Sequence, residues 1–196
     1  MKRAGIAWFE TICTEQLMYD AGLFGVKDRR TEMQRAYDAL ARAGSNLPER
    51  ATVGSAGYDI ISPIDTHFEP GVPVNIPTCL RCWMENDYFL MIVPRSGLAF
   101  RYGLRLVNSV AIIDSDYYYA DNVGHIVLRM TADSELSIKA GDKIAQGIFL
   151  PYGLIQNDAT TEERHGGFGS TSDSNGKNAM AGEAYANKAA LNVSLA

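Results

Sequence analysis

From residue 51 onward, apolar residues occur in short runs, some of them alternating with polar residues, and Gly, Pro, Asn and Asp separate the runs. This spacing is typical of β-strands joined by turns, and no run there has the length of an ordinary helix. The pattern therefore predicts an all-β sandwich or barrel. The expected strands are 72–76, 88–93, 104–107, 110–113, 125–130, 136–138 and 144–150.

The N-terminal part of the chain has a helical pattern instead. Thr31, followed by Gln34, has the Ser/Thr-x-x-Glu/Gln spacing of a capping box, which marks the start of a helix. Gly44 stands where a glycine can end that helix in a left-handed conformation. Between these ends, four apolar residues recur on one helical face: Met33, Tyr37, Leu40 and Ala41.

A second, shorter helix is expected over residues 15–21, capped by Thr14. With a first strand near residues 6–12, the two helices form a predicted insertion at about 14–44, ahead of the β core. Two interpretations stay open. The insertion is either a decoration that packs on the domain or at an oligomer edge, or a helical pair that binds a protein partner.

Residues 172–196 are rich in Ala, Asn, Ser and Gly and have few bulky side chains. Such a segment cannot bury enough apolar surface to offset the entropy of ordering, so we expect a disordered tail. The whole chain of 196 residues is 46% hydrophobic, which suffices for one good core. We therefore expect a single domain over residues 1–171.

The charge and the cysteines bear on partners and location. The net charge is −5 and no run of Lys or Arg occurs, so we expect no nucleic-acid partner. The N-terminus has no apolar stretch like a signal peptide or membrane span, which predicts a cytoplasmic protein without a membrane contact. Cys79 and Cys82 form a C-x-x-C pair, but without a second ligand pair we expect both to be structural.

The segment RHGGFGST at 164–171 has the composition of a nucleotide-binding lid. Its glycines let backbone N–H groups approach oxyanions, Arg164 supplies charge-assisted hydrogen bonds, and Phe168 offers a flat face to a base. A flexible linker can have the same glycine content. Four further segments precede it in fixed order: GSAGYDI at 54–60, PRSGLA at 94–99, NSVAIIDSDY at 108–117 and GDKIAQ at 141–146.

Together the five segments resemble the five ordered motifs of the trimeric dUTP pyrophosphatase (dUTPase) family, over roughly residues 47–171. With its helical insertion, the chain is similar to the phage and Firmicutes variety. The resemblance implies a distorted jelly-roll β-barrel, a homotrimer, and active sites built from neighbouring chains. It also implies hydrolysis of dUTP to dUMP and pyrophosphate, which keeps uracil out of DNA and supplies dUMP for thymidylate synthesis. A phage-encoded member would act in the host cytoplasm.

The resemblance assigns roles in the reaction to the following residues. Asp114 is the carboxylate that orients and deprotonates the attacking water. The hydroxyl of Ser96 reaches the oxygen between the α- and β-phosphates, where negative charge develops. Arg95 and Gln146 contact the phosphates. Asp59 acts through water on Mg²⁺, the implied cofactor, or by fixing a phosphate-binding side chain.

Other residues are implied to select the nucleotide. Asn108 begins a hairpin whose backbone reads uracil, and the ring of Tyr117 packs on the deoxyribose and excludes a 2′-hydroxyl. Phe168 covers the uracil. The remaining substrate-binding residues of the last motif are Arg164, Gly169, Ser170 and Thr171.

The sequence departs from the family pattern at several places, among them the final motif, which is shorter after Arg164 than in many members. Ala111 stands where a glycine is usual, and Lys143 replaces a common arginine. The connection from Tyr117 to Gly124 is longer than in many members. Its residues 118–123 are a second candidate surface for a protein partner.

Two other functions compete with dUTP hydrolysis as interpretations of the sequence. A dCTP deaminase shares the implied fold, but no glutamate occupies the place needed for removal of an amino group. A regulatory nucleotide sensor would bind a protein partner through 14–44 or 118–123 and hydrolyse little. The intact set of Asp114, Arg95, Ser96 and Gln146 favours retained hydrolysis.

Overall fold

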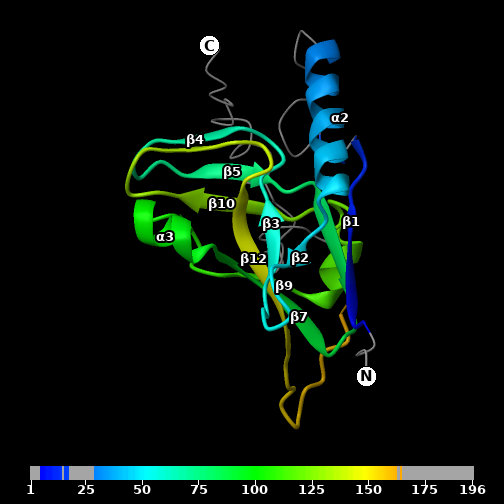
Figure 1. Cartoon of the computed structure of the whole chain (residues 1–196). Helices are drawn as coiled ribbons and strands as arrows, with labels where there is room; N and C mark the ends of the chain where they lie inside the picture. The colour runs from blue at the N-terminus through cyan, green and yellow to red at the C-terminus, as the bar shows by residue number, and fades with distance from the viewer. Residues whose placement is uncertain (1–4, 15, 18–28, 163, 165–196) are drawn as a thin grey trace, which may run out of the picture.

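The computed structural model describes residues 5–14, 16–17, 29–162 and 164. Strands dominate it, which confirms the predicted all-β class (Figure 1). The strands are β1 (Ala7–Thr11), β2 (Glu49–Arg50), β3 (Tyr58–Ile61), β4 (Thr66–Phe68), β5 (Val74–Pro77), β6 (Leu80–Met84), β7 (Tyr88–Pro94), β8 (Arg105–Leu106), β9 (Ala111–Ile113), β10 (Val127–Thr131), β11 (Leu136–Ile138) and β12 (Lys143–Pro151). The helices are α2 (Arg29–Ser45), α3 (Ser96–Tyr102) and the 3₁₀ helix η1 (Ser115–Tyr119).

The largest sheet has five antiparallel strands in the order β2-β3-β12-β7-β9. A three-stranded sheet, β5-β10-β8, and two pairs, β11-β4 and β1-β6, complete the β structure. The side chains between these sheets pack as one core, because apolar positions alternate along each strand. Its most deeply buried members include Phe68, Ile76, Leu90, Ile92, Met130 and Ile144.

Helix α2 lies beside β1, and both belong to the N-terminal part that precedes the core (Figure 1). The helix begins at Arg29, so the predicted cap at Thr31 is wrong and lies within the first turn. Its fully buried positions are alanines, Ala36, Ala39 and Ala43. Of the predicted face, Leu40 is partly buried against the core, whereas Tyr37 and Ala41 are exposed. Small side chains at the buried positions let a helix pack closely against its neighbours.

Of the predicted short helix at 15–21, Gln16 and Leu17 are helical, and the other residues lie outside the described chain. Thr14, the predicted cap, is helical as well. The predicted disordered tail at 172–196 also lies outside it. Among the described residues, no helix is both long and apolar enough to cross a membrane.

The short helix α3 follows β7 directly and was not predicted. It ends at Gly103, which has a left-handed φ of 64° and donates its N–H to the carbonyl of Ala99 at 2.9 Å. A Cβ at Gly103 would also lie 2.2 Å from Oδ2 of Asp133. Only glycine satisfies both constraints, so Gly103 fixes where the helix ends.

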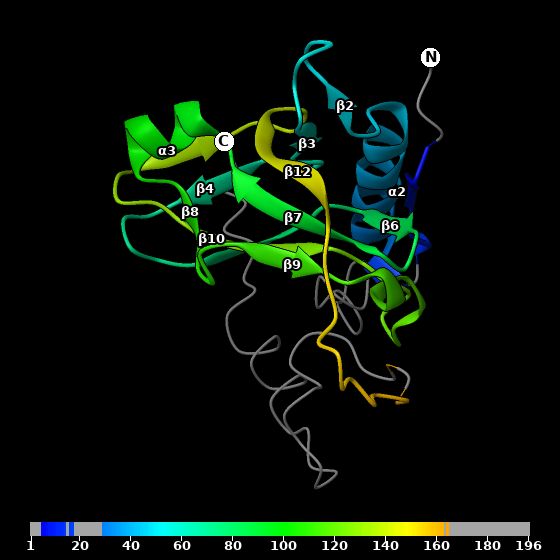
Figure 2. The ribbon, with the colours of Figure 1, turned by 90° about the horizontal axis from the view of Figure 1, so that it is seen from below.

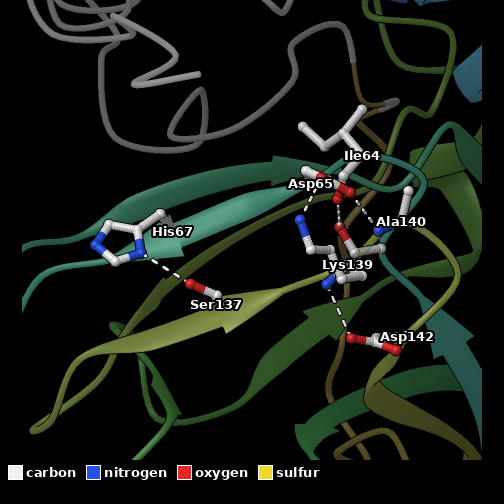
Figure 3. A network of polar contacts seen from close by, with 8 residues as sticks. Ile64, Asp65, His67, Ser137, Lys139, Ala140 and Asp142 are labelled. Atoms are coloured by element: carbon white, nitrogen blue, oxygen red, sulfur yellow. Dashed lines mark hydrogen bonds and ion pairs between the residues drawn. The ribbon is translucent and has the colours of Figure 1, made fainter. Parts of the chain in front are cut away.

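Polar contacts fix the turn that leads into β12 (Figure 3). Asp65 accepts hydrogen bonds from the N–H of Ala140 at 2.8 Å and from Nζ of Lys139 at 2.9 Å. Asp142 accepts one from the N–H of Lys139 at 2.8 Å. These bonds satisfy backbone donors at the turn and so set where β12 begins, at Lys143.

Candidate active site

One group of predicted site residues gathers on the five-stranded sheet around Asp59 of β3. Gln146 of β12 lies opposite Asp59 in the ladder. Asp59 Oδ2 is 2.7 Å from Nζ of Lys143, and its Oδ1 is 3.6 Å from Nη1 of Arg95. With its side chain only 10% exposed, Asp59 holds two cations side by side. We call Asp59, Arg95, Ser96, Lys143 and Gln146 the phosphate half-site.

Gly57 makes room for the side chain of Gln146. A Cβ at Gly57 would lie 2.5 Å from Oε1 of Gln146 and 3.2 Å from its Cβ. The first value is far below a van der Waals contact, so any larger residue at 57 must displace the Gln146 amide. This role of Gly57 was not predicted, although the glycine lies within the GSAGYDI segment.

A cavity of about 530 Å³ adjoins the phosphate half-site. Its lining includes three cationic side chains, Arg95, Arg101 and Lys143, together with apolar side chains of α3 and β11. Ser96, the first residue of α3, is exposed, and the N–H of Arg95 donates to the carbonyl of Ile144 at 3.1 Å. The positive charge suits an anion such as a phosphate. Arg101 was not among the predicted site residues.

A second group, the carboxylate half-site, consists of Asp114, Asp116, Tyr117 and Arg164. The guanidinium of Arg164 donates one hydrogen bond to Oδ2 of Asp114 and another, at 2.9 Å, to Oδ1 of Asp116. Asp114 stands at the N-cap of η1, but its side chain makes no capping bond. Its carboxylate therefore does not cap η1 and is available for other contacts.

Burial raises the pKa of Asp114, and the negative charge of Asp116 raises it further, while Arg164 opposes both effects. The net shift is upward. Because burial penalises the charged form, Asp114 keeps its proton to a higher pH than an ordinary aspartate and is a stronger base once ionised.

Tyr117 is buried, with 5% of its surface exposed. Its hydroxyl donates to the carbonyl of His125 at 2.9 Å and accepts from Nδ2 of Asn122 at 2.7 Å. Cζ of Arg164 lies 5.8 Å from the centre of its ring. The hydroxyl is thus directed into the protein, and the guanidinium lies on the side of the ring near Asp114.

The turn at Asn108 differs from the predicted hairpin. Strand β8 pairs with β10 while β9 pairs with β7, so the turn joins two different sheets. Asn108 is exposed, its carbonyl accepts from the N–H of Val110 at 2.8 Å, and Ser109 has a φ of 68°. Ala111 lies in β9 opposite Ile92, where an extended backbone admits a methyl group.

The two half-sites lie apart within the chain. In the antiparallel ladder of β7 and β9, Ile113 is opposite Leu90, and Arg95 follows Leu90 by five residues. At about 3.3 Å per residue, the phosphate half-site is roughly 16 Å further along the strand than Ile113. Asp114 continues in the opposite direction, so α3 and η1 lie at opposite sides of the molecule (Figure 2).

Of the last predicted motif, Arg164 is described and joins the carboxylate half-site. Phe168, Gly169, Ser170 and Thr171 lie outside the described residues.

Cys79 and Cys82 are buried, and burial raises the pKa of each thiol to about 12. Both are therefore protonated and unreactive at neutral pH.

The family model for dUTPase matches residues 44–172, which include every residue of both half-sites. The chain belongs to the dUTPase family. Its reaction is the hydrolysis of dUTP to dUMP, as the resemblance in the sequence implies. This excludes dCTP deaminase as the assignment.

Similar proteins agree with this family. The deoxyuridine 5′-triphosphate nucleotidohydrolase of Lactococcus lactis subsp. lactis is 42% identical over 134 residues, covering 66% of this chain and 89% of that protein. The crystal structure of dUTPase from Streptococcus mutans has a TM-score of 0.52 and 37% identity, covering 56% of this chain and 88% of that one. The dUTPase of phage phi11 of S. aureus, 21% identical with a TM-score of 0.51 over 59% of this chain and 90% of that one, shares the fold.

Proposed function

We propose that this chain hydrolyses dUTP to dUMP and pyrophosphate in active sites that form between subunits of a homotrimer. The observation that carries the proposal is the separation of the half-sites along β7 and β9. Attack on the α-phosphate requires the base and the phosphate ligands within a few ångströms of one another. One chain cannot supply both to one nucleotide, whereas the phosphate half-site of one subunit can face the carboxylate half-site of its neighbour.

The phosphate half-site binds the triphosphate. Arg95, fixed by Asp59, and Gln146 hold the phosphate oxygens. The hydroxyl of Ser96 donates to the oxygen between the α- and β-phosphates, where negative charge accumulates as the bond breaks. Lys143 adds positive charge on the other side of Asp59.

The carboxylate half-site supplies the base. Asp114 orients a water molecule in line with the leaving pyrophosphate and accepts its proton as the oxygen attacks the α-phosphate. Arg164 holds Asp114 and Asp116 in the free chain and can transfer to the substrate phosphates when these bring a stronger negative charge. Once Arg164 has left the ring of Tyr117, the face that it covered is open to the deoxyribose, and Asn108 shapes the turn that reads uracil. Phe168, Gly169, Ser170 and Thr171 complete the lid.

The donor set fits Mg²⁺ that arrives with the nucleotide. The described residues contain no group of three His, Cys, Asp or Glu that could hold a metal. Mg²⁺ keeps several waters and leans on substrate phosphates, so it requires no such group. Asp59 would act through water, since both of its oxygens already have cationic partners. When bound, the ion neutralises phosphate charge.

Several broader features belong to the same proposal. We infer one domain over residues 1–171, a cytoplasmic location, and no nucleic-acid partner, from the net charge of −5. Contact of α2 with β1 favours the insertion as a structural decoration. A partner that binds at 14–44 or 118–123 is compatible with this arrangement, since neither segment contributes to a half-site.

Subunit mixing tests the shared site directly. Asp114→Asn and Arg95→Ala variants, each inactive alone, are unfolded together and refolded as mixed trimers. A site that takes Arg95 from one chain and Asp114 from the next regains activity in about a quarter of all sites at an equal ratio, by random assembly of a closed ring. Mixing without refolding is the control. No recovery in verified mixed trimers would place both residues of each site in one chain.

A further inference from the structure

Two consecutive tyrosines of η1 lie in different surroundings. Tyr117 is buried beside His125, whereas Tyr118 contacts the separate sheet of β1 and β6. The hydroxyl of Tyr118 donates a hydrogen bond to Oε1 of Glu10, a residue of β1. Cζ of Arg81, from β6, lies 4.3 Å from the centre of the Tyr118 ring. Three elements distant in sequence therefore meet at one side chain.

Glu10 and Arg81 are themselves paired. They are opposite each other in the β1-β6 ladder, and Arg81 Nε lies 3.1 Å from Oε1 of Glu10 as an ion pair without hydrogen-bond geometry. The next pair on the same face, Trp8 and Trp83, stacks with its ring centres 4.1 Å apart. Cross-strand pairs of this kind stabilise the β1-β6 ladder, against which Tyr118 packs.

The contacts of Tyr118 are individually modest. The side chains of Arg81 and Glu10 are 28% and 36% exposed, so solvent screens their attraction. The hydrogen bond to Glu10 raises the pKa of Tyr118, which keeps the hydroxyl protonated as a donor. The hydroxyl donates to a carboxylate, and a cation lies over the ring of the same side chain. Together the two contacts fix one orientation of Tyr118.

The segment that Tyr118 belongs to has little stability of its own. Helix η1 is a five-residue 3₁₀ helix without a side-chain cap, and such short helices depend on tertiary contacts. It starts directly after Asp114. Gly124, with a φ of 73°, packs against the backbone of Tyr118, where a Cβ would come within 2.9 Å of its Cα. The backbone at Tyr118 is thus held from two sides.

We propose that Glu10, Arg81 and Tyr118 form a positioning cluster that fixes η1, and thereby the orientation of Asp114 at the site mouth. The cluster acts through the backbone and touches no reacting atom. This inference rests on the proposed role of Asp114. The inference also explains the longer connection after Asp114, because that connection contains Tyr118, which contacts the N-terminal strand β1.

The test compares Tyr118→Phe with Tyr119→Phe as matched control. Tyr119 is 71% exposed and its ring meets that of Tyr118 edge-on, with centres 4.9 Å apart, a contact that phenylalanine keeps. We expect Tyr118→Phe to lower kcat about tenfold, because small displacements of a catalytic group are costly. Affinity for a non-hydrolysable dUTP analogue should change less than about threefold, since the phosphate half-site is unaltered. Tyr119→Phe should match the wild type in both.

A double-mutant cycle adds a readout that a general loss of stability would not give. Glu10→Gln keeps an acceptor but weakens it, and we expect a smaller loss of kcat in the same direction. In the Glu10→Gln background, Tyr118→Phe should cost clearly less than in the wild type, because the two residues act together. Sedimentation and thermal unfolding check that each variant is a folded trimer, and Glu10→Gln carries the test if Tyr118→Phe does not fold.

Equal kcat for Tyr118→Phe and Tyr119→Phe, or strictly additive losses in the cycle, would overturn the positioning cluster. Asp114→Asn separates this from failure of the proposed function. If Asp114→Asn is inactive while Tyr118→Phe is normal, only the cluster is wrong. If Asp114→Asn retains substantial turnover, the proposed base is wrong, and the positioning cluster, which depends on that base, is wrong too.

Discussion

At the scale of single residues, we expect Asp59 to serve the proposed site by holding other side chains rather than by binding substrate. Its two oxygens contact Lys143 and Arg95, and its side chain is nearly covered. A carboxylate in this position fixes the direction of the Arg95 fork, which must match phosphate geometry. The same contacts explain how a lysine at 143 can stand where an arginine is common, because one ammonium suffices to pair with Asp59.

Asp59→Asn should therefore weaken substrate binding more than it slows chemistry. Without the charge, Arg95 loses its orientation, and we expect KM for dUTP to rise about tenfold, the equivalent of roughly 1.4 kcal/mol. Steady-state kinetics measures both constants. Lys143→Arg, which keeps the charge pair, should stay near the wild type. A fall in kcat at unchanged KM would contradict this role.

Gly57→Ala should impair the site while leaving the fold intact. The added methyl displaces the end of a flexible Gln146 side chain, which costs little stability but moves a phosphate ligand. We expect kcat/KM to fall about tenfold or more, with an almost unchanged melting temperature. Gly54→Ala is the matched control, because a Cβ there meets nothing within 4 Å. Equal kinetics for the two variants would be inconsistent with the crowding at Gly57.

The pH dependence of kcat/KM should report Asp114. A base must be ionised, so activity is lost as pH falls through its raised pKa, above the usual value of about 3.9. Asp116→Asn removes a negative charge beside Asp114 and should lower the apparent pKa of the acidic limb. Arg164→Met removes a positive charge and should raise that pKa, whatever its effect on the maximal rate. Shifts in the same direction would mean that another group titrates.

At the scale of elements, the loop after Asp114 combines packing and function. Because the Tyr117 ring is buried, Tyr117→Ala would open a cavity as well as alter the sugar contact. Tyr117→Phe is the cleaner variant. It leaves the carbonyl of His125 and the amide of Asn122 with one partner fewer, which should lower the free energy of unfolding by about 1–2 kcal/mol.

The same variant should retain discrimination between dUTP and UTP, since the ring that we propose to exclude the 2′-hydroxyl is still present. Urea unfolding gives the stability and competition assays give the selectivity. Loss of selectivity without loss of stability would assign the gate to the hydroxyl.

Local pattern predicted some elements well and others badly, for physical reasons. Strand β7 was predicted from a short apolar run between turn residues, and β11 from apolar residues that alternate with a polar one because only one face meets the core. Helix α3 was missed because its end depends on the contact of Gly103 with Asp133. The face of α2 was predicted only in part, because Leu40 packs against the core but the fully buried positions are alanines, which a pattern of bulky apolar residues does not mark. The motifs identified the chemistry, but the separation of the half-sites required the register of β7 and β9.

At the scale of the whole molecule, the N-terminal strand and helix are part of the packed domain. Ile12, Leu17 and the alanines of α2 are buried with the core. Arg42 donates to the carbonyl of Pro63, next to the Asp65 contacts that fix the turn into β12. The insertion therefore supports the strand that carries Gln146, even though it contributes no residue to a half-site.

The opposite directions of β7 and β9 also imply how activity depends on enzyme concentration. A chain with different half-sites at its two sides associates head to tail, and in a closed ring of three every half-site finds its complement. A dimer of two such chains leaves one half-site of each subunit without its complement. Specific activity should therefore fall steeply when the enzyme is diluted below the dissociation range of the trimer, while KM stays constant. Initial rates across a dilution series, with chemically crosslinked trimers as the reference that does not fall, measure this loss.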